Sequence, residues 1–486
     1  MAVHLPLLPL EALRPRWCEP APRVVLEQTR VVVASALAAA AGVRAGMRRG
    51  GVQSLCPAAQ LLERDPGREQ AALRETALAL LRYTPEVALA EENSLLLNVG
   101  ASLSAFGGAR ALCRRVGADV TALGFGARIG LAPTAQGAWL LARHAGDGRR
   151  RTLGAAAMTR RLDALPLTVL PPARAHADWL HGIGCRHLGE LRRLPGAGLR
   201  RRCGVAVSQA LARAYGEAAE LHRWVEAPPN FSAGLELPQA VEQAEMLLFA
   251  ARRLLLQLCG WLSARQRAAA RFTLLLEHPR GYGVHAARPR HGTVEIALAE
   301  PAWQEEHMLR LLRERLARTA LAAPVTGLRL EAVDTLPWAP ASAALFPEPG
   351  GTPADYRRLL ELLTARLGDE AVLTPAPLAD HRPETRNRWR PAGTGTIAAS
   401  APAPAAERPF WLLERPLALA MSGHRPCYGT PLTLLRGPER IEAGWWDQAL
   451  ALRDYFIAED AAAVRYWIYR ERQAGRAQWF LHGLFA

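Results

Sequence analysis

Four glycines and a group of arginines between Trp179 and Gly216 have the types and spacing that bind phosphate. Gly182-Ile183-Gly184 precedes an apolar-periodic segment that ends near Leu194, and Pro195-Gly196-Ala197-Gly198 precedes a second helical segment. Glycine permits a tight turn and a close approach of the backbone to a ligand. A helix start adds unpaired N–H groups and the positive end of the helix dipole. The residues expected to contact phosphates are Gly182, Gly184, Gly196, Gly198, Arg200, Arg201 and Arg202.

Two glycine hairpins at this spacing are typical of tandem helix-hairpin-helix motifs. Such motifs hold a DNA duplex through its phosphates without reading its sequence. Arg192 and Arg193 add positive charge beside the hairpins. The alternative is a helical bundle in which the glycines only end helices.

Carboxylates that could hold catalytic metal ions are scarce in the first hundred residues. Transfer of a nucleotide needs carboxylates that bind two divalent metals. No Asp or Glu precedes Glu11, and an acidic pair, Glu91-Glu92, stands before the strand-like segment Leu95–Val99. That pair could equally be a solvated turn, and His4 alone is more typical of a structural strand histidine than of a metal ligand. We therefore expect no catalytic residue, no metal site and no cofactor.

The charge of the chain favours a polyanionic partner. Its 486 residues carry a formal charge of +15 and a pI of about 10.4, and all 60 basic residues are arginine. This balance points first to nucleic acid. Without lysine, the chain can form neither a lysine Schiff base nor a lysine phosphate clamp.

Cysteine usage and hydropathy indicate a cytoplasmic protein. The seven cysteines are scattered and form no CxxC pair, so neither a zinc ribbon nor a disulfide framework is indicated. No apolar run reaches the ~18 residues of a membrane span, and the N-terminus lacks a cationic signal region. We expect no membrane partner and a location in the cytoplasm, at the nucleoid.

The elements that would position these residues predict an α+β chain of several domains. Strand-like segments at Val87–Ala90 and Ser94–Val99 predict a hairpin, and helices are expected at Arg68–Leu81, Leu103–Val116 and Thr134–Ala145. Residues 231–337 predict a β-α-β-β-α-β order, a small sheet with two helices on one face. Its candidate phosphate contacts are Arg265, Arg267, Arg271, Arg280, Arg288 and Arg290.

The C-terminal part predicts a linker and then a compact block. Residues 338–408 contain Leu345-Phe346, an amphipathic helix from Thr352 to Leu367 and a low-complexity stretch expected to be disordered. Residues 409–486 are rich in strands and aromatics such as Trp445-Trp446. The aromatics suit either a docking surface or the core of a small β domain.

In order along the chain, several segments resemble the palm and fingers of Y-family DNA polymerases. The hairpins then fall at that family's thumb, residues 231–337 at its little finger, and the aromatic block at the C-terminus of UmuC-like bacterial mutagenesis proteins, so the resemblance covers nearly the whole chain. The segments that carry the palm and finger resemblance are Val33-Ala34-Ser35 through Met47, Ser54-Leu55-Cys56-Pro57, Thr84-Pro85-Glu86-Val87 and Gly126–Ala142. The domains implied are 1–148, palm and fingers; 160–227, thumb; 231–337, little finger; 338–408, linker; and 409–486, docking block.

The resemblance also marks where this chain departs from active polymerases. The family's two first-strand aspartates fall at Ala2 and His4. Its triphosphate-binding tyrosine and arginine fall at Ala36 and Ala39, and a phosphate-neutralising lysine falls near Ala135. These losses predict a retained scaffold without polymerase chemistry.

The resemblance implies a non-catalytic, DNA-binding adaptor in error-prone translesion synthesis. Leu345 and Phe346 resemble the apolar anchors of the peptide that grips the sliding clamp, with Ser342 at the place of the usual glutamine. The implied partners are damaged or primer–template DNA, the sliding clamp, an error-prone replicative-type DNA polymerase and a RecA-like accessory protein. Two alternatives remain open: an active translesion polymerase with a rearranged metal site, and a helix-hairpin-helix DNA-binding protein unrelated to polymerases.

Overall fold

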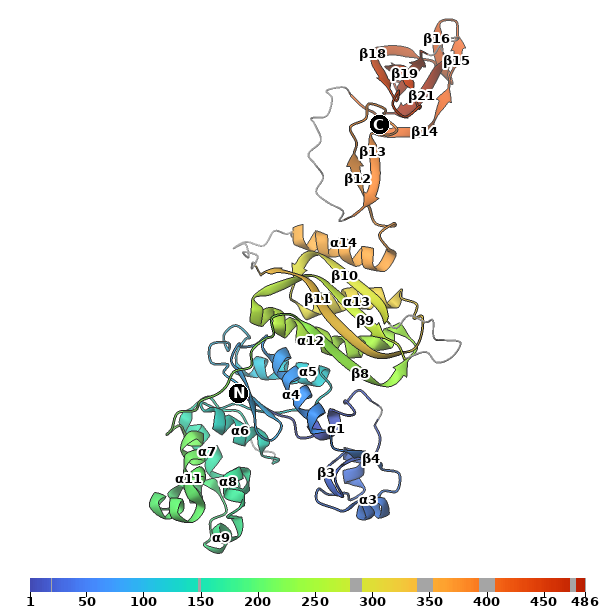
Figure 1. The fold of residues 1–486 in the computed structure, drawn as a ribbon. Helices are drawn as coiled ribbons and strands as arrows, with labels where there is room; N and C mark the ends of the chain where they lie inside the picture. Colours follow the sequence, from blue (N-terminus) through green and yellow to red (C-terminus); the bar gives the residue numbers. More distant parts are fainter. Residues whose placement is uncertain are drawn as a thin grey trace. The chain divides into compact units, whose positions relative to one another are not determined.

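The computed structural model describes residues 1–18, 20–146, 150–279, 291–338, 353–392, 407–472 and 478–485. Figure 1 shows the helices and strands along the chain. The chain divides into two compact units, Met1–Arg358 and Leu359–Ala486.

A four-stranded antiparallel sheet lies at the centre of the N-terminal region. Its order is β5 (Val87–Ala90), β6 (Ser94–Leu97), β1 (Ala2–His4) and β7 (Arg128–Gly130). Because side chains alternate along a strand, the sheet has two buried faces. Val3 and Leu95 pack under α4 (Pro66–Leu80) and α5 (Ala109–Ala122), whereas Ala2 and Leu96 pack under α6 (Ala135–Arg143).

The predicted hairpin at Val87–Ala90 and Ser94 onward is confirmed, as are the helices at α4 and α6. The expected helix at Leu103–Val116 begins later, at Ala109. Gly107 and Gly108 have φ of +74° and +89°, a backbone conformation that favours glycine and ends the preceding turn before the helix can start. Thr134 caps α6 by accepting a hydrogen bond from the Gly137 N–H at 3.1 Å.

A smaller sheet follows β1 in the sequence. Ser35 caps the short helix α2, because its hydroxyl accepts a hydrogen bond from the Ala38 N–H. The elements are α1 (Leu8–Glu11), β2 (Arg23–Glu27), β3 (Arg30–Ala34), α2 (Ala36–Ala40), α3 (Arg49–Leu55) and β4 (Gln60–Glu63), with the strand order β3-β2-β4.

A group of helices packs on the α6 side of the central sheet. Leu188, Leu191 and Leu211 join the same apolar core as Leu140 of α6. The helices are α7 (Ala155–Asp163), η1 (Leu167–Val169), α8 (Pro171–Arg174), α9 (Ala177–Gly182), α10 (Leu188–Arg193) and α11 (Gly196–Tyr215).

The predicted β-α-β-β-α-β order in residues 231–337 is confirmed. The sheet has the order β10-β9-β11-β8, and α12 and α13 pack against each other and against its strands. Gly260 lets α12 approach α4 closely, since an added Cβ would lie 1.9 Å from the Leu78 carbonyl oxygen. The elements are β8 (Ser232–Val241), η2 (Ala244–Met246), α12 (Leu247–Arg265), β9 (Arg267–Glu277), β10 (His291–Ala302), α13 (Glu305–Ala317) and β11 (Val325–Pro337).

One helical segment among the described residues, Ala244–Arg265, is long and apolar enough to cross a membrane. Its most apolar window is 72% buried inside the protein. Most apolar side chains of α12 therefore belong to the interior of the first unit, although Phe249 is exposed.

The second unit consists almost entirely of strands. After α14 (Pro353–Leu367), which begins in the first unit, a hairpin leads into a five-stranded sheet of order β14-β21-β20-β19-β18 and a small sheet of order β15-β16-β17. The strands are β12 (Leu373–Pro377), β13 (Asn387–Pro391), β14 (Trp411–Ala418), β15 (Ala420–Ser422), β16 (Arg425–Tyr428), β17 (Thr430–Pro431), β18 (Thr433–Ala443), β19 (Ala451–Glu459), β20 (Arg465–Glu471) and β21 (Trp479–Leu484). The α+β, multidomain class expected from the sequence is confirmed.

Candidate functional site

At the C-terminal end of β1, His4 stands where Y-family polymerases carry one of their two first-strand aspartates. His4 pairs in register with Ser94 of β6 on one side and Arg128 of β7 on the other. Its Nδ1 lies 3.0 Å from the Glu92 carbonyl oxygen and 3.1 Å from the Ser94 hydroxyl. The side chains at this end of the strand are therefore an imidazole, a hydroxyl and a guanidinium.

Glu92 belongs to the tight turn between β5 and β6. Three residues, Glu91 to Asn93, connect the paired residues Ala90 and Ser94, and Glu92 and Asn93 have φ of +52° and +54°, the left-handed backbone of tight hairpin turns. The Glu92 carboxylate is already paired with two cations: it forms an ion pair with Arg143 of α6 and a second one, at 2.7 Å, with Arg174 of α8. The Arg143 side chain is only 6% exposed and stacks on Trp139 at 4.2 Å from the ring centroid.

The electrostatics of this corner oppose a cation. Burial, followed by the charges of Arg143 and Arg128, lowers the pKa of His4 to about 4. Burial is the larger cause of this lowered pKa, and the guanidinium groups of Arg143 and Arg128 add to it, whereas Glu92 acts in the opposite direction. A divalent metal would be repelled by the same guanidinium charges.

The residues present do not fit the two metal ions that Y-family chemistry uses. Magnesium needs oxygen ligands, usually carboxylates, and β1 supplies none. Within the described ranges, no three His, Cys, Asp or Glu side chains come together as a possible metal site. Glu11 is buried and accepts a hydrogen bond from the Gly126 N–H at 2.8 Å, so it fixes the backbone just before β7.

The positions that correspond to the triphosphate-binding residues of Y-family polymerases carry no phosphate-binding side chains in this chain. Ala36 and Ala39 lie on the short helix α2. Ala135 starts α6, at the opposite end of that helix from Arg143. Its N–H donates to the carboxylate of Glu220 at 3.0 Å, so this helix start is already occupied by an acidic side chain.

The first glycine hairpin connects α9 to α10, as predicted, but its amides are used within the protein. Gly184 has φ of +83°, and its N–H donates to the His181 carbonyl oxygen at 3.0 Å. At the start of α10, Glu190 accepts hydrogen bonds from the N–H groups of Arg186 and His187. Gly182 is exposed, and a Cβ there would meet nothing within 4 Å.

The second glycine hairpin lies where the sequence analysis placed it, between α10 and α11, but it is shorter than expected, because α10 ends at Arg193 and α11 already begins at Gly196. Gly196 and Gly198 lie in the first turn of α11, not in a turn before it. The glycine with a left-handed backbone is Gly204, with φ of +77°, where α11 changes direction. The helix begins earlier than expected because Pro195 followed by Gly196-Ala197-Gly198 suits a helix start as well as a turn.

The start of α11 nevertheless has the predicted free donors. In the described structure, the N–H groups of Gly196, Ala197 and Gly198 meet no acceptor, since Pro195 provides no side-chain cap. Arg200, Arg201 and Arg202 follow on the same helix; all three are exposed, and none has a carboxylate partner within the part of the chain that is described.

The arginines predicted for the β-α-β-β-α-β region are less available. Arg271 forms ion pairs with Glu295 at 2.7 Å and Asp334 at 3.2 Å. Arg265 donates to backbone carbonyl oxygens, and Arg267 donates to the Thr335 hydroxyl. Arg280, Arg288 and Arg290 lie outside the described residues, as do Leu345 and Phe346.

The C-terminal aromatics divide between core and surface, so the core interpretation holds for part of them, and a docking surface stays a prediction for the exposed ones. Tyr455 and Trp467 are buried and stack at 4.0 Å between ring centroids. Trp445 and Trp446 are 70% and 54% exposed. Their loop is fixed by the buried Arg382, which donates to Asp447 at 2.6 Å.

Sequence reasoning missed the cations that neutralise the acidic pair. Arg143 ends a helix and Arg174 ends another, places where arginine is ordinary because it complements the helix dipole. Nothing in their local sequence indicates that both reach Glu92.

Known proteins with similar sequences match most of the chain. Residues 10–143 match the family described as impB/mucB/samB. Protein ImuB of Caulobacter vibrioides, from strains NA1000 / CB15N and ATCC 19089, is 27% identical over 467 residues, which cover 91% of this chain and 100% of that protein.

The comparison with solved structures finds matches at low sequence identity. A Dbh ternary complex is 17% identical, with a TM-score of 0.40, and covers 68% of this chain and 99% of its own. DinB from Sulfolobus solfataricus is 17% identical, with a TM-score of 0.39, and covers 70% of this chain and 99% of its own.

Proposed function

Because this chain resembles the ImuB mutagenesis proteins along 91% of its length, we propose that it is a polymerase-like adaptor without polymerase activity. It binds damaged or primer–template DNA during error-prone translesion synthesis. It links the sliding clamp to an error-prone replicative-type DNA polymerase, with a RecA-like protein as a further partner. It acts in the cytoplasm, at the nucleoid.

The observation that carries this proposal is the pairing of Glu92 with Arg143 and Arg174. In an active polymerase, carboxylates at this sheet end hold metals that stabilise the transferred phosphoryl group. Here the carboxylate is neutralised by guanidinium groups, and its neighbour on β1 is His4. The corner stabilises the packing of α6 and α8 on the sheet instead of holding metal.

DNA binding is assigned to the start of α11. Three free backbone donors and three exposed arginines without carboxylate partners, within the described structure, offer phosphates both hydrogen bonds and charge. These contacts carry no sequence preference, which suits a protein that must act at lesions in any sequence.

A substitution in the acidic pair separates an adaptor from an enzyme. We expect Glu91→Ala with Glu92→Gln to leave damage-induced mutation frequency in cells unchanged, because neither side chain takes part in chemistry. Arg200→Ala, Arg201→Ala and Arg202→Ala together should lower both DNA affinity and mutation frequency. Loss of mutagenesis by the Glu91/Glu92 variant, with unchanged thermal stability, would instead indicate catalysis.

Partner binding is assigned to two further segments and is tested by one capture assay. Leu345→Ala with Phe346→Ala should abolish capture of the sliding clamp, while the matched variant Pro347→Ala with Pro349→Ala keeps it.

Trp445→Ala with Trp446→Ala should abolish capture of the polymerase, because exposed tryptophans on a fixed loop are typical interface anchors. The control for this variant is Leu434→Ala with Leu435→Ala. Unchanged capture would refute the corresponding assignment.

A further inference from the structure

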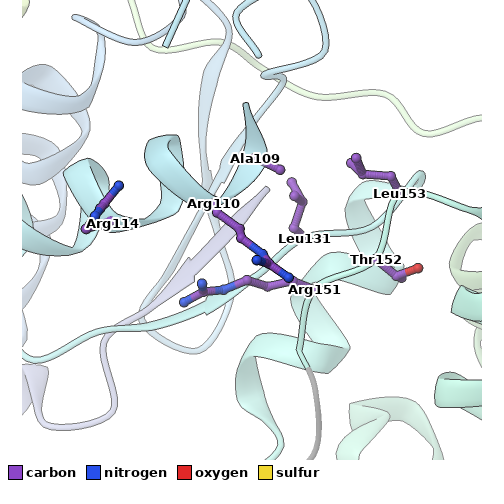
Figure 2. Close-up of a pocket in the computed structure, with 7 residues that line it drawn as sticks. All are labelled: Ala109, Arg110, Arg114, Leu131, Arg151, Thr152 and Leu153. Atoms are coloured by element: carbon purple, nitrogen blue, oxygen red, sulfur yellow. The ribbon is translucent and has the colours of Figure 1, made fainter. Parts of the chain in front are cut away.

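Two adjoining cavities at the β7 edge of the central sheet are lined by arginines and, among the residues that the structure describes, by no Asp or Glu. Arg110, Arg114 and Arg151 line a cavity of about 650 Å³, with Leu131 and Leu153 forming its apolar side (Figure 2). The second cavity shares Arg114 and Arg151 and adds Arg128 and Arg150. We call the two cavities, with these five arginines, the arginine trough.

Ordinary secondary structure places these side chains together. Arg110, Arg114, Gly117 and Thr121 recur every three or four residues, so they lie on one face of α5. Opposite them, the chain returns beside β7: the Leu131 N–H donates to the Arg150 carbonyl oxygen, and the Thr152 N–H donates to that of Leu131. The trough therefore lies between one helix face and a paired backbone segment.

The charges of the trough are not compensated within the described structure. Elsewhere, arginines such as Arg64 are paired with carboxylates at distances near 2.7 Å. No carboxylate partner is present for Arg110, Arg114, Arg128 or Arg151 in the described ranges. Arg150 is held by the carbonyl oxygens of His144 and Gly146, which orient it without neutralising it.

The start of α5 adds to the same positive potential. Gly108 caps the helix without a side-chain hydrogen bond. The N–H groups of Ala109, Arg110 and Ala111 have no acceptor among the described residues, and Ala109 and Arg110 line the first cavity. Five guanidinium groups near one another repel, and a bound polyanion relieves that repulsion.

We propose that the arginine trough binds the phosphodiester backbone of a nucleic-acid strand, as a contact surface separate from α11. The inference rests on the proposed function, since the trough would be a second surface of the same protein that contacts the bound DNA. Its length favours a polymer: twelve residues of helix span about 18 Å, and successive phosphates of one B-form strand are about 3.4 Å apart along the axis. A single small anion would leave most of the arginines unpaired.

The test measures how DNA affinity depends on salt. Arg110→Ala with Arg114→Ala and Arg151→Ala should make the slope of log K against log [salt] shallower by about 2 for a single-stranded oligonucleotide. The control, Arg74→Ala with Arg310→Ala and Arg313→Ala, removes the same charge from exposed positions on α4 and α13; its slope should stay at the wild-type value.

A second measurement uses the unaltered protein. Phenylglyoxal modifies accessible arginines, and mass spectrometry locates them. Bound oligonucleotide should protect Arg110, Arg114 and Arg151 at least threefold and leave Arg310 and Arg313 as reactive as before.

The outcomes separate the two proposals. If the wild-type chain binds DNA but the trough variant keeps its slope and DNA protects none of these arginines, the trough proposal is wrong and the adaptor proposal stands. The trough proposal is then wrong even if another polyanion, poly-glutamate, or a nucleoside triphosphate binds in the trough. If the wild-type chain binds no DNA, the adaptor proposal fails as well.

Discussion

A few side chains at one end of β1 decide whether this protein has polymerase chemistry. The absence of acidic residues before Glu11 is read directly from the sequence, and the prediction of a strand at His4 is confirmed by its pairing with Ser94 and Arg128. The fate of Glu92 could not be predicted, because Arg143 and Arg174 are 51 and 82 residues away along the chain. Contacts of that separation depend on how α6 and α8 pack, and no local pattern specifies it.

The Arg143 side chain should contribute measurably to stability. We expect Arg143→Ala to lower the free energy of unfolding by about 1–3 kcal/mol, because it removes a buried hydrogen bond, a stacking contact and one partner of Glu92. The lost hydrogen bond is to the Val169 carbonyl oxygen at 2.7 Å.

Arg174→Ala is the matched control, since it removes the same charge from a side chain that is 45% exposed. It should cost about 0–1 kcal/mol. Urea unfolding of the full chain compares the two, and equal losses would show that Arg143 is no more than a surface partner.

Individual elements were predicted well where hydrophobic periodicity is strong. The hairpin of β5 and β6, the helix α4 and the β-α-β-β-α-β order all follow from alternation or from helical spacing. The start of α11 was wrong, because Gly196 and Gly198 adopt helical conformations although their residue type also permits a turn. Backbone conformation at a glycine depends on tertiary packing, so Gly204 could not be distinguished from them by sequence.

The change of direction of α11 at Gly204 leads to a prediction about stability. We expect Gly204→Ala to destabilise the protein by about 1 kcal/mol, because alanine disfavours φ of +77°. Gly198→Ala should be neutral or slightly stabilising, since alanine favours a helix and nothing lies within 4 Å of the added Cβ. Thermal unfolding of both variants checks this; the reverse order would contradict the assigned turn.

At the scale of the whole molecule, charge and resemblance agree. An all-arginine chain with a charge of +15 favours a polyanion, and the predicted resemblance to bacterial mutagenesis proteins is confirmed by the match to ImuB. Composition could not show where the charge is uncompensated. Two of the places in the first unit where the structure brings together arginines without carboxylate partners, among the described residues, are the start of α11 and the arginine trough.

Primer extension separates an adaptor from an active polymerase in a single assay. The purified chain is given a primer–template and all four deoxynucleotides with magnesium and then manganese, beside a binding assay on the same DNA. The account predicts binding that weakens steeply with salt and no added nucleotide with either metal. Incorporation that persists in preparations free of other polymerases and disappears in the Glu91→Ala, Glu92→Gln variant would contradict it.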